Sequence, residues 1–160
     1  MEYRELLRRL AETPKRLAQL VVDASDRALD EPGEGGWSAR DVLAHLYDAE
    51  VLIYRRALLA LAAGGVAERP DLERWRSLRR GRLRKEQLLG DFALQRQASL
   101  NLLDGLDAEG WQGLPGELTE LVRRWVGHDE EHFRQLERLL GWTHGEAMER
   151  RRRFAEEWSQ

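Results

Sequence analysis

Apolar side chains recur every three or four residues along most of this chain, the spacing that places them on one face of an α-helix. Breaks rich in glycine and proline divide the pattern into four long stretches, at residues 3–28, 39–63, 85–106 and 117–140. A charged stretch at 146–158 predicts a further helix. Strict alternation of apolar and polar residues persists nowhere, so no strand is predicted. We therefore predict an all-α fold, a four-helix bundle with a short C-terminal helix.

Local sequence signals bear on the course of the first helix and on the start of the second. Thr13-Pro14 lies inside the first stretch. Because proline lacks an N–H and clashes with the carbonyl of Leu10, we expect either one kinked helix or two abutting helices. Ser38 is expected to cap the second helix, with Asp41 at the third helical position reaching back to the cap.

Three of the four histidines fall on predicted inward faces. The inward stripe of the second helix runs through Val42, His45, Leu46, Ala49, Ile53, Ala57 and Ala60. The last long helix continues its stripe through His128 and His132, whose Cβ atoms would be about 5–6 Å apart. His144 lies past the glycine that ends this helix, and we expect it at the surface. Bundles build metal sites from inward side chains of facing helices, so His45, His128 and His132 are candidate ligands of one ion.

Three neutral imidazoles suit Zn(II), Ni(II) or Fe(II) and leave positions open for water or substrate. The chain has no cysteine, so no thiolate can take part. The alternative is that each histidine is a hydrogen-bonded core residue, although three unpaired imidazoles would be costly to bury. Asp48, Asp129 and Gln135 could orient the rings through hydrogen bonds, or they could be solvated.

Length and composition limit the number of domains and the cellular location that we expect. A chain of 160 residues with a net charge of −3 suffices for one core and is short for two domains. We predict the bundle over residues 1–143 and a charged helix or tail over 144–160. The N-terminus is charged and lacks the apolar segment of an export signal, and no apolar run approaches the ~18–20 residues of a membrane span. We therefore expect a cytoplasmic protein without a membrane partner.

The chain resembles the DinB/YfiT-like superfamily of four-helix metalloproteins in two motifs. These are Trp37-Ser38-x-x-x-Val42-Leu43-x-His45-Leu46-x-Asp48-x-Glu50 and His128-x-x-x-His132-x-x-Gln135-Leu136. The resemblance covers the chain from the first helix to Gly141. It implies an up-down-down-up bundle, often a homodimer, with a divalent metal, commonly nickel or zinc, on His45, His128 and His132.

The resemblance implies activities of more than one kind. Some relatives resemble S-transferases that use low-molecular-weight thiols, and others resemble hydrolases or isomerases. We infer a metal-dependent enzyme that activates such a thiol, or water, for transfer or hydrolysis on a small molecule, with no catalytic residue assigned beyond the metal ligands. Arg96 interrupts the apolar stripe of the third helix and is a hypothetical anchor for a carboxylate of the thiol. Alternatively, it snorkels or pairs with an acid.

Other functions remain open. A non-catalytic metal- or partner-binding stress-response bundle would need the same histidines. Residues 128–132 also match the metalloprotease signature H-x-x-E-H with Glu131 as general base, but only residues 133–160 remain to supply a third ligand. The basic segment 74–85, which contains Trp75, would allow a nucleic-acid patch, which the acidic balance of the chain disfavours.

Overall fold

A computed structural model describes residues 2–65, 70–72, 83–108 and 115–142, together with 145–146, 148–149, 152–153 and 156. All regular elements within these ranges are helical, which confirms the predicted all-α fold. The long elements are α1 (Tyr3–Val21), α3 (Ala39–Ala49) continued through a π-helical turn η2 (Glu50–Tyr54) into α4 (Arg55–Ala62), α6 (Lys85–Ala108) and α7 (Pro115–Leu139). A short α2 (Asp26–Asp30) and a 3-10 turn η1 (Glu34–Gly36) join α1 to α3. None of the helices described is both long and apolar enough to cross a membrane.

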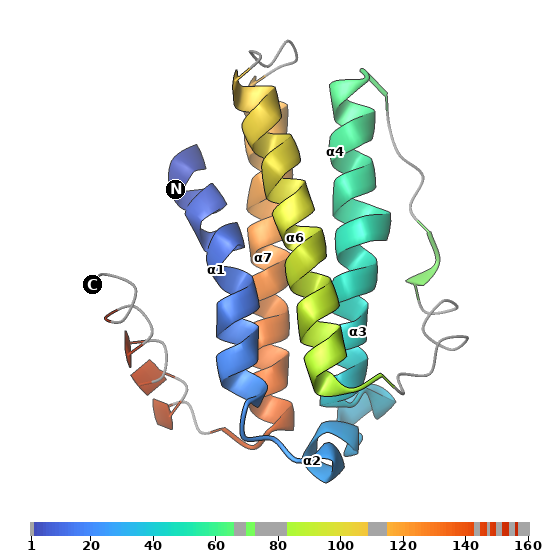
Figure 1. Ribbon diagram of the computed structural model, residues 1–160, viewed down its shortest axis with the longest axis vertical. Coiled ribbons are helices and arrows are strands. Elements are labelled where there is room, and N and C mark those ends of the chain that lie inside the picture. The colour runs from blue at the N-terminus through green and yellow to red at the C-terminus, as the bar shows by residue number, and fades with distance from the viewer. Residues whose placement is uncertain are drawn as a thin grey trace.

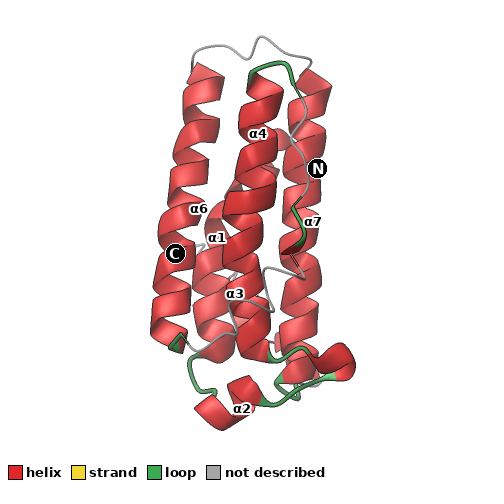
Figure 2. Ribbon diagram, turned by 90° about the vertical axis from the view of Figure 1, so that its right-hand side faces the viewer, coloured by secondary structure: helices red, strands yellow, loops and turns green. Residues whose placement is uncertain are grey.

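The long helices form an up-down-down-up bundle. In Figure 1, α1 runs toward the end marked by α2, and α3 and α4 return in the opposite direction. Helix α6 runs parallel to α4, and α7 runs back beside α1. Figure 2, turned by 90° from Figure 1, shows α4 and α7 side by side. The order of directions implied by the family resemblance is therefore confirmed.

Proline 14 does not divide the first helix. Residues Tyr3–Val21 form one helix with Pro14 inside it. Proline has no N–H to donate to the carbonyl four residues earlier, at Leu10. That carbonyl instead accepts a hydrogen bond of 2.8 Å from Nη1 of Arg96 on α6. A side chain from another helix therefore supplies the donor that proline lacks.

The predicted cap at the start of α3 is confirmed. The Ser38 hydroxyl accepts from the Asp41 N–H at 3.1 Å, and the Asp41 carboxylate accepts from the Ser38 N–H at 3.0 Å. This capping box fixes the first residue of α3. It therefore sets the position of His45, which lies two turns into the helix.

The predicted inward stripe is wrong beyond Ala49, because the π-helical turn adds a residue to the repeat. Leu58 and Glu50 are buried, whereas Ala57 and Ala60 are only half-buried. A π-turn shifts the face that follows it by about one position. Within the turn, Glu50 is buried and the ring of Tyr54 stacks on the buried Trp125.

The core has two apolar clusters with a polar layer between them. One cluster contains Leu17, Val42, Leu46, Phe92, Phe133 and Leu136, and the other contains Leu6, Leu10, Leu58, Leu103, Val122 and Trp125. Every long helix has a buried polar residue between its contributions to the two clusters. These residues are Thr13 on α1, Glu50 on η2, Arg96 and Ser99 on α6, and Asp129 on α7.

The remaining predictions fall largely beyond the described residues. The described residues from Gly145 to Glu156 are helical, as expected for a C-terminal helix, but the rest of 144–160 is outside them. His144 and most of the basic segment 74–85 are also outside them. The proposed boundary between the bundle and the tail therefore stays a prediction.

Candidate metal centre

The structure brings together three histidines that the sequence placed on two helices. His45 projects from α3, and His128 and His132 project from successive turns of α7. Nε2 of His128 lies 3.2 Å from Nε2 of His45 and 3.1 Å from Nε2 of His132. Candidate ligand atoms of all three residues lie within 4.8 Å of one another. The predicted convergence of the three rings is thus confirmed.

The separations of the ring nitrogens fit a single shared ion. Zinc–nitrogen bonds of about 2.0–2.1 Å, at angles between octahedral and tetrahedral, separate neighbouring ligand atoms by about 2.9–3.4 Å. The two shortest Nε2 separations, 3.1 and 3.2 Å, lie inside that range. The three histidines could therefore hold a divalent metal.

The hydrogen positions on the rings also favour a cation. Oε1 of Gln135 lies 2.7 Å from Nδ1 of His132, so that Nδ1 donates and Nε2 of the same ring keeps its lone pair. Nε2 of His128 faces two imidazole nitrogens, but it has either one hydrogen or one lone pair to offer. It cannot satisfy both contacts. A cation between the rings would remove this conflict, because every Nε2 would direct a lone pair at it.

The centre is partly exposed, and aromatic rings lie beside it. All three histidines are half-buried, so the site is not sealed inside the core. The indole of Trp37 packs edge-on against His45, with ring centroids 5.4 Å apart. The ring of Tyr54 lies 5.1 Å from that of His128. An aromatic side chain therefore packs beside two of the three candidate ligands.

The three residues predicted to orient the histidine rings differ in what they contact. Gln135 does hold the ring of His132, through the 2.7 Å contact. Asp48 is buried on α3, one turn after His45. Asp129 is buried beside His128, but its carboxylate accepts from Arg96 and from the hydroxyl of Thr13 at 2.7 Å. The hypothesis that Asp129 orients a histidine ring is therefore replaced by a role in a separate network.

Arg96 is part of that network and does not have the free guanidinium that a substrate anchor needs. Its side chain is 1% exposed. Nε and Nη2 donate to the carboxylate of Glu50 at 2.9 Å, and Nη1 and Nη2 donate to that of Asp129 at 2.8 and 2.9 Å. With the bond from Nη1 to the Leu10 carbonyl, all five N–H groups are used. The structure agrees with the alternative interpretation, in which Arg96 pairs with acids.

Burial and charge act in opposite directions on these groups. Burial alone would lower the pKa of Arg96, but the carboxylates of Asp129 and Glu50 raise it above its usual range, so the guanidinium stays charged. Burial raises the pKa of Asp129 above its ordinary value, although Arg96 and Thr13 act to lower it. Glu50 also accepts from Nε1 of Trp125 at 2.9 Å.

Sequence reasoning did not find Glu50, Thr13 or Trp125 as members of one network. Arg96 gave the clearest signal, as a charged residue on an apolar stripe. Its two acidic partners are 46 and 33 residues away. On a chain with 29 acidic residues, nothing local distinguishes these two from solvated ones.

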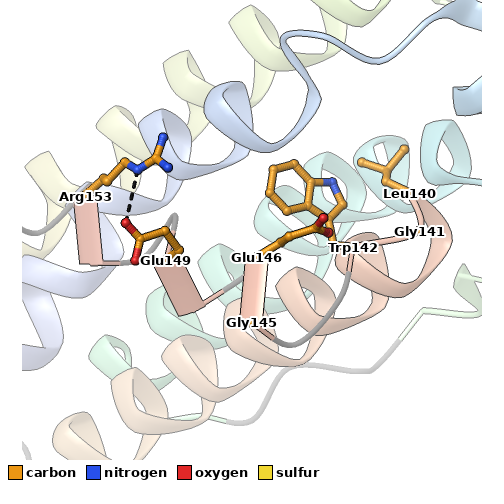
Figure 3. A pocket seen from close by; sticks show the side chains of 7 residues that line it. All are labelled: Leu140, Gly141, Trp142, Gly145, Glu146, Glu149 and Arg153. Carbon is orange, nitrogen blue, oxygen red and sulfur yellow. Dashed lines mark hydrogen bonds and ion pairs between the residues drawn. The ribbon is translucent and has the colours of Figure 1, made fainter.

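The metalloprotease alternative takes Glu131 as its general base. This residue is exposed on α7, whereas His128 and His132 are half-buried. A separate cavity of about 570 Å³ lies past the end of α7, lined by Leu140, Gly141, Trp142, Gly145, Glu146, Glu149 and Arg153. In Figure 3, Trp142 stands beside Glu146, and Arg153 pairs with Glu149. None of the three histidines lines this cavity.

The fold and the site together define a four-helix bundle with a three-histidine centre between antiparallel helices. The family model of the DinB superfamily matches residues 9–136. The chain therefore belongs to the DinB superfamily, as its two motifs indicated.

Relatives with curated names share most of this chain. The Bacillus subtilis protein named "Putative metal-dependent hydrolase YfiT" is 33% identical over 136 residues, which cover 82% of this chain and 70% of that protein. An Oceanobacillus iheyensis protein with the same type of name is 28% identical over 140 residues, covering 86% and 74%. The solved structure of Bacillus subtilis YfiT matches with a TM-score of 0.65 at 24% identity, over 89% of this chain and 91% of that one. Its four-helix bundle topology is described as unusual.

Proposed function

We propose that this protein is a metal-dependent hydrolase of a small molecule, with a divalent ion held by His45, His128 and His132. The observation that carries the proposal is the convergence of three imidazole nitrogens, with neighbouring separations of 3.1 and 3.2 Å. The names of the relatives support the reaction class. Zinc, nickel and iron(II) all suit this ligand set.

The chain's own residues would prepare the site for this chemistry. A divalent ion on three imidazoles leaves coordination positions for water and substrate and activates that water at neutral pH. Gln135 holds the proton on Nδ1 of His132, so that Nε2 faces the ion as a lone pair. Trp37 and Tyr54 pack against His45 and His128 and would limit the access of bulk water beside a bound substrate.

Thiol transfer is the second activity that the sequence suggested, and it needs the same ion. Its predicted anchor for the cofactor is not available, because every N–H of Arg96 is bonded inside the core. Hydrolysis requires no such anchor. We therefore place hydrolysis first, and a homodimer remains an expectation from family resemblance.

The proposal is tested by assaying tag-free protein before and after removal of metal. A panel of small esters, amides and phosphoesters is offered to the purified protein, and electrophiles with a low-molecular-weight thiol form a second panel. We expect hydrolysis that is lost on chelation and restored by one divalent metal. Metal-dependent turnover in the thiol panel alone would replace hydrolysis with transfer. Tight metal binding without turnover in either panel would favour the non-catalytic alternative.

A further inference from the structure

The buried network around Arg96 connects all four long helices at one level of the bundle. Arg96 belongs to α6, Glu50 to the turn η2 between α3 and α4, and Asp129 to α7. The backbone carbonyl of Leu10 and the hydroxyl of Thr13 add contacts from α1. Glu50 and Asp129 are 1% and 3% exposed, so neither carboxylate gains much from water.

The same network touches the two elements that carry the metal ligands. Asp129 follows His128 directly in α7. Glu50 is five residues after His45, in the same continuous helical rod. The guanidinium of Arg96 is bidentate to both carboxylates, at 2.8–2.9 Å. It therefore fixes the distance between these two carboxylates and limits rotation of either helix about its axis.

A second connection runs through aromatic rings to the histidine itself. Nε1 of Trp125 donates to Oε1 of Glu50 at 2.9 Å. Tyr54, at the end of the π-helical turn, stacks on Trp125 with ring centroids 5.3 Å apart and an interplanar angle of 14°. The Tyr54 ring also lies 5.1 Å from that of His128. A shift of Glu50 would thus be transmitted to a residue that packs against a ligand.

Apolar packing alone does not fix this arrangement. Helix pairs joined only by apolar contacts tolerate small sliding and rotation, whereas a bidentate charged contact has one geometry. Three ligands on two helices can bind one ion only if the helices keep one relative position. A displacement of a fraction of an ångström would move Nε2 of His45 away from an ion that His128 and His132 hold. Burying two carboxylates and a guanidinium costs desolvation energy, and a role in specifying the helix arrangement would explain why the chain keeps them.

We propose that the Glu50–Arg96–Asp129 network positions α3 relative to α7 and so sets the affinity and geometry of the three-histidine centre. The inference rests on the proposed metal site. Arg96, Glu50 and Asp129 are positioning residues, which act through His45 and His128. Residues that orient metal ligands typically change metal affinity by about 10–100-fold, and we expect about tenfold here.

The test compares Arg96→Lys with Arg40→Lys in the full chain. Arg40 is a matched control because it too is buried and bonded to two acids, Asp26 and Asp30, at 3.0 and 2.7 Å. Those acids lie on α2, so Arg40 does not join α3 to α7. Lysine keeps the charge at both positions and loses the planar guanidinium, which makes bidentate contacts at Arg96 and single bonds to two acids at Arg40.

Two readouts are measured on protein that circular dichroism shows to be folded. Affinity for Zn²⁺ is measured by competition with a chromophoric chelator, and the visible absorption of bound Co²⁺ reports coordination geometry, which a loss of stability alone would not change. We expect Arg96→Lys to weaken Zn²⁺ binding about tenfold and to alter the Co²⁺ spectrum, and Arg40→Lys to change neither. Glu50→Gln provides the same comparison if Arg96→Lys does not fold.

The possible failures are distinguishable. If the unmodified protein does not bind Zn²⁺ or Co²⁺, the proposed function fails, and the positioning role fails with it. If the unmodified protein binds both ions and the folded Arg96→Lys or Glu50→Gln variant matches its affinity and spectrum, the positioning role alone is overturned. An equal loss of affinity in Arg40→Lys would also overturn it, because the effect would then follow from any buried arginine.

Discussion

Replacement of His128 by alanine is expected to weaken binding of a divalent ion by more than about a hundredfold. Loss of a residue that only orients a ligand costs about 10–100-fold, and loss of a ligand should cost more. His128 is the strongest choice, because its Nε2 faces both of the other Nε2 atoms, at 3.2 and 3.1 Å. Metal content and chelator competition measure the effect directly, with His144→Ala as the histidine control.

Thermal unfolding gives an independent measure of the same loss. An ion at a hundred times its dissociation constant stabilises the folded protein by about 2.7 kcal/mol. For a chain of this size that corresponds to a rise in Tm of roughly 5–10 °C. We expect the rise in the unmodified protein and not in His128→Ala. An equal rise in both proteins would show that the ion binds elsewhere.

Arg96→Met is expected to destabilise the metal-free protein by about 3–5 kcal/mol. Removing one member of a buried ion network leaves the remaining charges without partners in the core. Here two carboxylates, on residues 1% and 3% exposed, would lose the guanidinium that binds both, and the Leu10 carbonyl would lose its donor. Urea unfolding followed by circular dichroism measures the change.

Arg40→Met is the matched control for this loss of stability. The acidic partners of Arg40 have side chains 88% and 58% exposed, so water can solvate them once the guanidinium is gone. We therefore expect a distinctly smaller cost than for Arg96→Met. A third variant that replaces Glu50, Arg96 and Asp129 together by apolar residues should recover much of the stability, since no charge is then left unpaired. Equal losses in Arg96→Met and Arg40→Met would contradict this account of the network.

Local signals in the sequence were sufficient for the elements and for the three histidines that converge in the structure. Helical periodicity and the glycine breaks located the second, third and fourth long helices to within a few residues, and Ser38 and Asp41 form the predicted capping box. The first helix ends at Val21, earlier than the predicted residue 28. The three histidines could be assigned because each continues an apolar stripe, where a polar residue needs an explanation. The order of helix directions came from the family resemblance, because periodicity carries no information about it.

The polar layer could not be predicted, for two physical reasons. First, a π-helical turn has no strong sequence signal, so the periodic pattern placed Ala57 inward where the structure buries Glu50 and Leu58. Second, the ion network joins residues from four helices, and its members are ordinary charged residues until the fold brings them together. Pro14 offered a partial clue, because it leaves the Leu10 carbonyl without its helical donor.

The most direct test of the metal centre is a crystal structure of the protein loaded with one divalent metal, with anomalous data collected on both sides of that metal's absorption edge. We expect a single anomalous peak between α3 and α7, at about 2.0–2.2 Å from Nε2 of His45, His128 and His132. A peak at another place on the chain, or a bound ion that leaves His45 out of its coordination, would contradict the account.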